Sequence, residues 1–204
     1  MTTKSFGLSV SRETIERLEE YHALLIKWNS KINLVSRSTI KDAWTRHFRD
    51  SAQIYQYSPE NWSHWVDLGS GGGFPGAVIA ILAAELNPSG RVTLVESDQR
   101  KSAFLRNVFR ETGVAATVIA KRIEQIDPLG ADVISARALA ELKQLFHLAH
   151  VHAAPNCTYL FPKGENWQKE MLVAEESWSF THSLIKSETD PKAIVLKIRE
   201  LRHV

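Results

Sequence analysis

Apolar residues recur at helical spacing through the first sixty residues. Residues 11–29 place apolar side chains three or four positions apart behind Ser11, a candidate N-cap, and residues 39–57 repeat the spacing. The pattern stops at Ser58-Pro59. We therefore expect residues 1–60 to form a helical cap.

From residue 61 to residue 204, short apolar runs alternate with amphipathic ones. Strands are expected at 64–68, 91–96, 116–120, 131–137 and 158–163, and helices at 74–85, 99–112, 138–151 and 165–176. The last two strand-like runs, 180–187 and 193–201, flank Thr-Asp-Pro and predict a hairpin. The alternation predicts an α/β fold with a doubly wound, mostly parallel, seven-stranded sheet, in which the hairpin supplies one antiparallel strand.

The first expected strand leads into VDLGSGGGFPG, residues 66–76, with five glycines within eight positions. Glycine lets a backbone turn sharply and approach a ligand closely. In a doubly wound sheet, ligands bind beyond the carboxyl ends of the strands, where this turn lies. The dinucleotide pattern G-x-G-x-x-G also fits by letter, but a glycine-rich run produces it by chance.

The better phased pattern is Asp67-x-Gly69-x-Gly71-x-Gly73, which starts at the strand. It resembles the first motif of class I S-adenosylmethionine-dependent methyltransferases. In that class the acidic residue ends the strand, and the glycines make room for the amino acid half of the cofactor.

Two later positions favour a nucleoside cofactor. Glu96 ends the second strand, 20 residues after Gly76, where a carboxylate accepts hydrogen bonds from ribose hydroxyls. In the alternative interpretation, Glu96 only flanks the next helix together with Asp98. Ile123-Glu124 follows the third strand, a place that borders the adenine in this methyltransferase class. Taken alone, KRIEQI would be a short surface helix.

Composition excludes several other classes. With 44% hydrophobic and 24% charged residues, the chain is an ordinary globular protein of one domain, or of one domain with a small appendage. The single cysteine, Cys157, excludes an internal disulfide and a cysteine-based zinc site, and we expect no metal. No apolar run is long enough to cross a membrane, and the N-terminus lacks the apolar core of a signal peptide. A reducing cytoplasm is the expected compartment.

The net charge of +2 does not by itself indicate a nucleic-acid binder. Basic residues are nevertheless concentrated in residues 37–50 and in residues 100–110. Each cluster is either a nucleic-acid surface or the solvated face of a helix.

Several longer stretches together resemble one family, the ribosomal small-subunit RNA guanine-N7 methyltransferases, also called the glucose-inhibited division protein B family. They are WNSKINLVS (28–36), RHFRDS (46–51), VDLGSGGGFPG (66–76), VESDQRKSAFLR (95–106), KRIE (121–124), ISARAL (134–139) and PKG (162–164). The resemblance covers most of the chain, but it is weak in the C-terminal third outside PKG. It implies a fold of class I methyltransferase type, with residues 61–204 as the S-adenosylmethionine-binding domain.

The resemblance also implies a reaction, the transfer of a methyl group from S-adenosylmethionine to N7 of a guanine in small-subunit (16S) ribosomal RNA. The implied cofactor contacts are Gly69, Phe74, Ile123, Glu124 and Arg137. The wider methyltransferase class adds Asp67, Gly71, Gly73 and Glu96. Phe74 has an alternative interpretation, as a core residue that opens a helix.

N7 of guanine carries a lone pair and no proton, so the reaction requires alignment more than a general base. Arg137 ends the fourth strand and Lys163 the fifth, so topology brings both near the cofactor cleft, where each is expected to contact O6 or a phosphate. In the alternative, Arg137 is a structural ion-pair partner and Lys163 a solvated strand end.

Arg46, His47 and Arg49 are expected to complete the RNA surface, with His47 also a candidate catalytic residue. His47 is alternatively a helix histidine hydrogen-bonded to a carboxylate such as Asp50, and the two roles can coexist.

The expected partners are small-subunit ribosomal RNA or the ribosomal subunit, with no membrane, and we expect a monomer. An S-adenosylmethionine-dependent methyltransferase acting on another RNA or on a small molecule is the main alternative. An NAD-dependent oxidoreductase and a non-enzymatic RNA-binding protein are the others.

Overall fold

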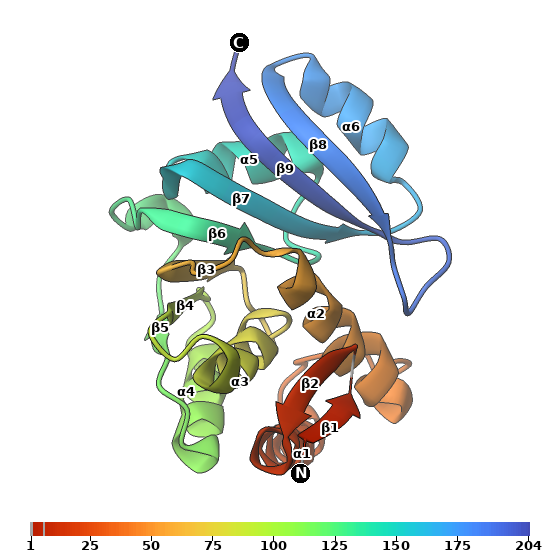
Figure 1. Cartoon of the computed structure of the whole chain (residues 1–204), viewed down its shortest axis with the longest axis vertical. Helices are drawn as coiled ribbons and strands as arrows, with labels where there is room; N and C mark the ends of the chain where they lie inside the picture. Colours follow the sequence, from red (N-terminus) through yellow and green to blue (C-terminus); the bar gives the residue numbers. More distant parts are fainter. Residues whose placement is uncertain (1, 6) are drawn as a thin grey trace.

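The computed structural model describes residues 2–5 and 7–204, and its centre is a twisted seven-stranded sheet (Figure 1). The strands run in the order β5-β4-β3-β6-β7-β9-β8. Their bounds are β3 His64–Leu68, β4 Arg91–Val95, β5 Thr117–Ile119, β6 Ala131–Ser135, β7 Ala153–Lys163, β8 Trp178–Lys186 and β9 Ile194–His203. Only β9 is antiparallel to its neighbours β7 and β8, and the other pairs are parallel. The predicted fold class and its antiparallel strand are confirmed.

Helices cover both faces of the sheet and create two separate cores. Successive side chains of β3 point to opposite faces, so Trp65 joins one cluster and Val66 the other. The helices are α3 Gly76–Leu86, α4 Gln99–Thr112, α5 Leu142–His150 and α6 Trp167–Glu175. α3 and α4 pack on the face of Trp65, and α5 and α6 on the other. α3 is apolar around most of its circumference, because the N-terminal part of the chain covers its outer side.

The N-terminal part is helical only in part. A hairpin of β1 Thr2–Ser5 and β2 Leu8–Ser11 precedes α1 Arg12–Asn29. The expected regular helix over 39–57 is wrong. The chain there forms the 3₁₀ turn η1 Ile40–Asp42, the π-helical turn η2 Trp44–Arg49, the short helix α2 Asp50–Gln53 and the 3₁₀ turn η3 Ile54–Tyr57. An apolar spacing of three to four residues fits α-helical, 3₁₀-helical and π-helical turns alike, so the sequence pattern does not distinguish them.

The cap is fastened to the sheet domain at the start of α1. Ser11 caps the helix by accepting a hydrogen bond from the Thr14 backbone N–H at 3.3 Å. The Glu85 carboxylate of α3 accepts from the Ser11 hydroxyl at 2.8 Å and from the Thr14 hydroxyl at 2.6 Å. Further along α1, Tyr21 and Leu25 lie in the same buried cluster as Ala77 of α3. The cap and the sheet domain therefore share one core.

The loop over residues 136–141 lies where the sequence predicts the start of a helix. α5 begins only at Leu142, four positions later than expected. Ala138 within the loop has a φ of 53°, a left-handed conformation that is uncommon for a residue with a side chain. β7, in contrast, starts at Ala153, earlier than predicted. Within the described residues, no helix has both the length and the apolar character needed to cross a membrane.

Candidate functional site

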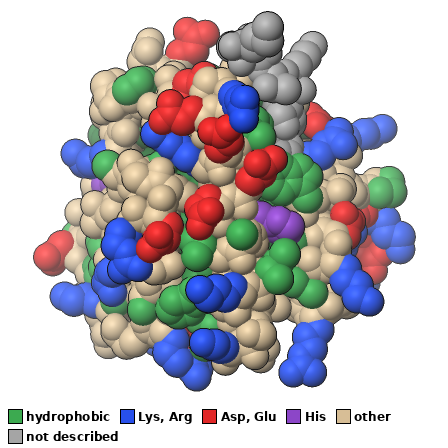
Figure 2. All heavy atoms as spheres, turned by 90° about the horizontal axis from the view of Figure 1, so that it is seen from below, with side chains coloured by type: hydrophobic (Ala, Val, Ile, Leu, Met, Phe, Trp, Pro, Cys, Tyr) green, Lys and Arg blue, Asp and Glu red, His purple; other side chains and the backbone are tan. Residues whose placement is uncertain are grey.

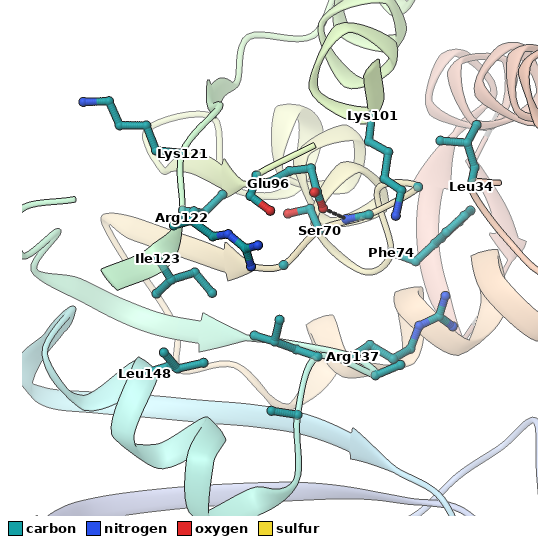
Figure 3. Close-up of a pocket in the computed structure, with 18 of the residues that line it drawn as sticks. Leu34, Ser70, Phe74, Glu96, Lys101, Lys121, Arg122, Ile123, Arg137 and Leu148 are labelled. Carbon is teal, nitrogen blue, oxygen red and sulfur yellow. Dashed lines mark hydrogen bonds between the residues drawn. The ribbon is translucent and has the colours of Figure 1, made fainter. Parts of the chain in front are cut away.

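A cavity of about 600 Å³ lies at the carboxyl ends of β3, β4 and β6 (Figure 3). Of the predicted site residues, its wall contains Gly69, Gly71, Phe74, Glu96, Ile123, Glu124, Arg137 and His47. The remaining lining residues are Leu34, Val35, Ser70, Gly72, Val95, Ser97, Lys101, Lys121, Arg122, Ala138, Leu139, Ala140, Gln144 and Leu148. Asp67 and Gly73 are not on the wall.

The glycine turn after β3 is the floor of this cavity, and three of its residues adopt left-handed backbone conformations. The φ angles are 66° at Gly69, 56° at Gly71 and 96° at Gly73. A Cβ atom on Gly71 would have no neighbour closer than the Gly69 carbonyl oxygen at 3.9 Å. A Cβ on Gly73 would instead collide with the Tyr21 hydroxyl and with Ala77. Gly71 therefore leaves room for a ligand, and Gly73 leaves room for the cap.

Asp67 lies beneath the turn and is fully buried. Its carboxylate accepts hydrogen bonds from the Ser135 hydroxyl at 2.7 Å and from the Gly76 backbone N–H at 3.1 Å. Burial raises its pKa to about 6, against the lowering effect of these hydrogen bonds. The structure gives Asp67 a contact with the first N–H of α3 rather than a place on the cavity wall.

Glu96 joins the two loops that border the cavity. One carboxylate oxygen accepts from the Gly71 backbone N–H at 2.7 Å, and the other accepts from the Asp98 N–H at 2.8 Å. Figure 3 shows the first of these bonds as the dashed line. Each carboxylate oxygen can accept a second hydrogen bond, so Glu96 is both a loop anchor and a free acceptor toward the cavity. Asp98 itself caps α4, as its hydrogen bond from the Arg100 N–H at 2.8 Å shows.

Phe74 joins the cavity wall to the cap. Its ring stacks on Tyr21 with centroids 5.4 Å apart, and it contacts the rings of His47 and Phe48. The Arg137 guanidinium carbon lies 5.3 Å from the ring centroid on the cavity side. Phe74 is therefore a core residue that also lines the cavity, although it precedes α3 rather than opening it. Its contact with the cofactor stays a prediction.

Cap residues that the sequence pattern did not single out as site residues also close over the glycine turn. The Asn29 side chain accepts hydrogen bonds from the Leu34 and Val35 backbone N–H groups, both at 2.9 Å. This contact holds Leu34 against Gly72, where an added Cβ would meet the Leu34 carbonyl oxygen at 2.9 Å. Asn29, Leu34 and Val35 all lie in the motif WNSKINLVS. The family resemblance of this motif was therefore the one sequence feature that could have indicated their place at the site.

Basic residues border the cavity on the side of α4 and the 3₁₀ turn η4 Ile123–Gln125. Figure 3 shows Lys101 and Arg122 extending toward the cavity, while Lys121 points away from it. None of these three forms an ion pair within the part of the chain that the structure describes. Lys101 belongs to the basic cluster of residues 100–110, whereas the sequence pattern gave Lys121 and Arg122 no role at the site.

Arg137 leaves the end of β6 and turns toward the cap (Figure 3). Its guanidinium donates to the Asp50 carboxylate at 3.0 Å, to the Arg46 carbonyl at 3.2 Å and to His47 Nδ1 at 2.9 Å. The ion-pair interpretation of Arg137 therefore holds in this structure. Arg137 nevertheless lies on the cavity wall, so it can form the ion pair with Asp50 and still face the cavity.

His47 is neutral in this arrangement. Because Arg137 is a permanent donor, His47 Nδ1 accepts, and Nε2 donates to the Thr39 hydroxyl at 2.8 Å. Burial lowers the pKa of His47 to about 4, with the Arg137 and Arg46 charges adding to the effect. The alternative of a hydrogen bond from His47 to Asp50 is wrong, because the two ring nitrogens contact Arg137 and Thr39.

A second cavity of about 480 Å³ adjoins the first. The two share His47, Arg137 and the loop residues 138–140. Lys163 lines the second cavity only, and its ammonium group contacts the Glu170 carboxylate at 2.6 Å and the Ala140 carbonyl at 3.0 Å. The alternative of a solvated strand end is wrong, because the Lys163 side chain is only 11% exposed.

The other predicted RNA contacts lie at the edge of this region. Arg46 lines the second cavity and forms an ion pair with Asp190, and Arg49 lines neither cavity and pairs with Glu188. On the face seen in Figure 2, acidic, basic and apolar side chains are interspersed. No cluster of three or more potential metal ligands occurs in residues 2–5 and 7–204.

Comparisons with known proteins agree with this architecture. The model of the family described as rRNA small subunit methyltransferase G (GidB) matches residues 14–195. A protein of Ruegeria sp. (strain TM1040) named ribosomal RNA small subunit methyltransferase G is 53% identical over 97% of this chain and 96% of its own length. The protein of that name from Rhodospirillum centenum is 50% identical over 97% of this chain and 88% of its own length.

Solved structures share the fold at low sequence identity. A methyltransferase from Aquifex aeolicus, described as S-adenosylmethionine-dependent, superimposes with a TM-score of 0.59 at 11% identity, covering 81% of this chain and 98% of the other. An O-methyltransferase from Bacillus cereus in complex with S-adenosylhomocysteine gives 0.56 at 13% identity over 91% of both chains. Since the family model spans most of the chain and its relatives match nearly the full length, the chain belongs to the rRNA small subunit methyltransferase G family and is, as predicted, an S-adenosylmethionine-dependent rRNA methyltransferase.

Proposed function

We propose that this protein transfers a methyl group to N7 of a guanine in small-subunit ribosomal RNA, with the first cavity holding S-adenosylmethionine. The juxtaposition of two cavities at the ends of β6 and β7 carries the proposal, because they share Arg137 and loop residues 138–140. One cavity suits the methyl donor and the other the acceptor base. Other RNAs and small molecules are alternative acceptors.

Three features of the first cavity suit the cofactor. Gly71 leaves open space above the turn, which suits the amino acid half. Glu96 is an acceptor for ribose hydroxyls, and Ile123 and Glu124 form an edge for the adenine. Gly69 and Phe74 complete the wall. Asp67 and Gly73 act from beneath, by shaping the turn.

When bound, S-adenosylmethionine supplies an activated methyl group, which the N7 lone pair takes as the carbon–sulfur bond breaks and its electrons return to sulfur. The protein contributes alignment and exclusion of water. Arg137 lies between the cavities and contacts either the donor carboxylate or the acceptor nucleotide. His47, held neutral, positions Arg137 through Nδ1. Lys163 contacts the acceptor nucleotide from the second cavity.

Arg46 and Arg49 extend the site toward the RNA as phosphate contacts. Both side chains are about half exposed and pair with acidic residues that are about one-third exposed, and such weak pairs exchange readily for phosphates. We further propose that the protein works as a monomer in the cytoplasm on RNA within the small subunit, and that residues 1–60 and 61–204 are its cap and its catalytic domain.

The decisive measurement is transfer of labelled methyl from S-adenosylmethionine to small subunits isolated from cells that lack this protein. The modified nucleotide is then mapped by strand cleavage specific for N7-methylguanine. We expect one labelled guanine in the small-subunit RNA. Label in another RNA, at another atom or only in small molecules would contradict the proposal.

A further inference from the structure

The two cavities differ in charge. The first is bordered by the four basic residues Lys101, Lys121, Arg122 and Arg137, of which Lys121 points away from it, and by the two acidic residues Glu96 and Glu124. The second is lined by the four acidic residues Asp50, Glu141, Glu170 and Asp190 and by the three basic residues Arg46, Arg137 and Lys163. A site for phosphate alone would carry an excess of cations. The second cavity therefore suits a group with N–H donors and a positive charge.

Glu170 is the half-buried carboxylate of this cavity with unused acceptor capacity. One of its oxygens accepts from the Lys163 ammonium at 2.6 Å and from the Leu142 N–H at 3.0 Å. The other oxygen has no hydrogen-bond partner within the part of the chain that the structure describes. Two donors thus hold the side chain in one orientation, and its second oxygen is left for a ligand.

The other carboxylates are less suited to hold a base. Asp50 accepts from Gln53, Thr189 and Arg137, so both of its oxygens are engaged. Asp190 is paired with Arg46 and accepts from the Lys192 N–H. Glu141 is exposed at the start of α5 and lacks the buried surroundings that strengthen a hydrogen bond. It is the competitor that an experiment must exclude.

Building on the proposed function, we propose that Glu170 is the residue that selects guanine, by accepting hydrogen bonds from its N1–H and 2-amino group in the second cavity. These two donors lie on the edge away from N7, so a base held by Glu170 presents N7 to the first cavity. Adenine has an acceptor at N1 and no 2-amino group, and a carboxylate repels it. Lys163, besides its contact with the acceptor nucleotide, holds Glu170 in position.

Charge makes the same contact favourable for the reaction. Methylation at N7 leaves the purine with a positive charge, and a carboxylate hydrogen-bonded to N1–H stabilises that charge as it develops. The second cavity is therefore expected to bind a 7-methylguanine nucleotide more tightly than a guanine nucleotide, and both more tightly than an adenine nucleotide.

Nucleotide binding to the folded protein saturated with S-adenosylhomocysteine tests this without RNA. The probes are 7-methyl-GMP, GMP and AMP, titrated by NMR. For the wild type we expect 7-methyl-GMP to bind at least about tenfold more tightly than AMP, because the free oxygen of Glu170, with two lone pairs, accepts from both base donors. Glu170→Gln keeps an oxygen for Lys163 and Leu142 but turns an amide NH2, which is a donor, toward the base, so the preference should fall to about twofold or less.

Two matched variants complete the design. Glu165→Gln changes an exposed carboxylate outside both cavities and should leave all three affinities as in the wild type. Glu141→Gln should also keep the preference. Loss of the preference in Glu141→Gln but not in Glu170→Gln would overturn the assignment of Glu170. Equal binding of the three nucleotides by the wild type would contradict the proposal that the second cavity binds guanine, without need of any variant.

The rate of methyl transfer distinguishes a failure of the role of Glu170 from a failure of the proposed function, on which that role rests. Single-turnover methylation of small subunits by Glu170→Gln should fall by about tenfold or more, with unchanged affinity for S-adenosylhomocysteine. If the wild type methylates N7 of a guanine and Glu170→Gln does so at the same rate, the role of Glu170 is wrong and the function stands. If the wild type methylates no guanine, the function itself is wrong.

Discussion

At the residue scale, the glycines after β3 differ in what surrounds their missing side chains. Gly71 opens into the cavity, and Gly73 faces Tyr21 of the cap. Both have positive φ angles, so any side chain carries a conformational cost of about 1 kcal/mol at either position. What differs is whether the added atoms displace a ligand or a neighbouring side chain.

Gly71→Val should therefore remain folded and lose S-adenosylmethionine binding by at least about tenfold, because the branched side chain occupies ligand space. Gly73→Ala should instead lower the free energy of unfolding by about 2–4 kcal/mol, because overpacking adds to the φ cost. Calorimetric titration and urea unfolding of both variants measure the two effects. Wild-type cofactor affinity in Gly71→Val would refute the assignment of this turn.

Glu96→Ala should weaken cofactor binding by roughly 1–3 kcal/mol, the range for losing a charged hydrogen-bond partner. It should also reduce stability, since the Gly71 and Asp98 N–H groups lose their acceptor. Titration with S-adenosylhomocysteine checks the first effect and thermal unfolding the second. A drop in stability with unchanged affinity would mean that Glu96 is a loop anchor only.

At the element scale, the π-helical turn η2 is one of the contacts between the cap and the sheet. It supplies the His47 ring and the Arg46 carbonyl to Arg137, and Asp50 follows it directly. A π turn is rare and commonly marks a functional site. On the other side of Arg137, the left-handed Ala138 turns the chain into the loop between the cavities. Two irregular elements thus meet at one guanidinium.

His47 should make this contact sensitive to acid. Its pKa is lowered to about 4 in the folded state, so the unfolded chain binds its proton first as the pH falls. Above about pH 6.5, both states are neutral at His47 and the folded state has its full stability. As the pH falls toward 4, the free energy of unfolding decreases by on the order of 2–3 kcal/mol. His47→Gln should flatten that loss in urea unfolding at pH 7, 5 and 4.

Asp67 also contributes to the pH dependence of stability, and it must be separated from His47. Its pKa is raised to about 6, so its contribution has the opposite sign and is lost as the pH rises from about 4 through 6. Because Asp67 is present in both proteins, the difference between wild type and His47→Gln isolates the histidine. The same acid dependence in both proteins would show that His47 is not the group responsible.

At the scale of the whole molecule, a small net charge of +2 conceals an uneven distribution. Cations line the first cavity in excess, and the cations near the second are paired with acidic residues. Phosphates approaching the first cavity would meet unpaired charge, whereas those near Arg46 and Arg49 must replace a carboxylate. RNA binding is therefore expected to depend on salt through counterion release.

Arg49→Glu should weaken binding to small subunits and reduce the slope of log affinity against log salt by about one, without changing cofactor affinity. Arg12→Glu, a charge reversal on an exposed α1 residue outside both cavities, is the control and should leave the slope unchanged. Filter binding across a salt series makes the comparison. A slope equal to that of the wild type in Arg49→Glu would remove Arg49 from the RNA surface.

The amino-acid sequence by itself determined the sheet, the turn after β3 and the family. The run HWVDL coincides with β3, and α4 has the predicted bounds because Asp98 caps its start and Gly113 adopts φ 66° at its end. These features are local. The burial of an apolar run and the φ angle of a glycine each depend on a few adjacent residues, so a short stretch of sequence predicts them.

Only the tertiary structure decided which charges meet. Arg137 pairs with Asp50, 87 positions away, and the loop of Leu34 lies over Gly72. The same holds for Lys163 and Glu170, whose contact depends on how the chain turns from the end of β7 into α6. Periodicity reports which face of an element is buried, but it carries no distance between elements. The boundary between the two cavities, and the acidic character of the second, follow from such distances.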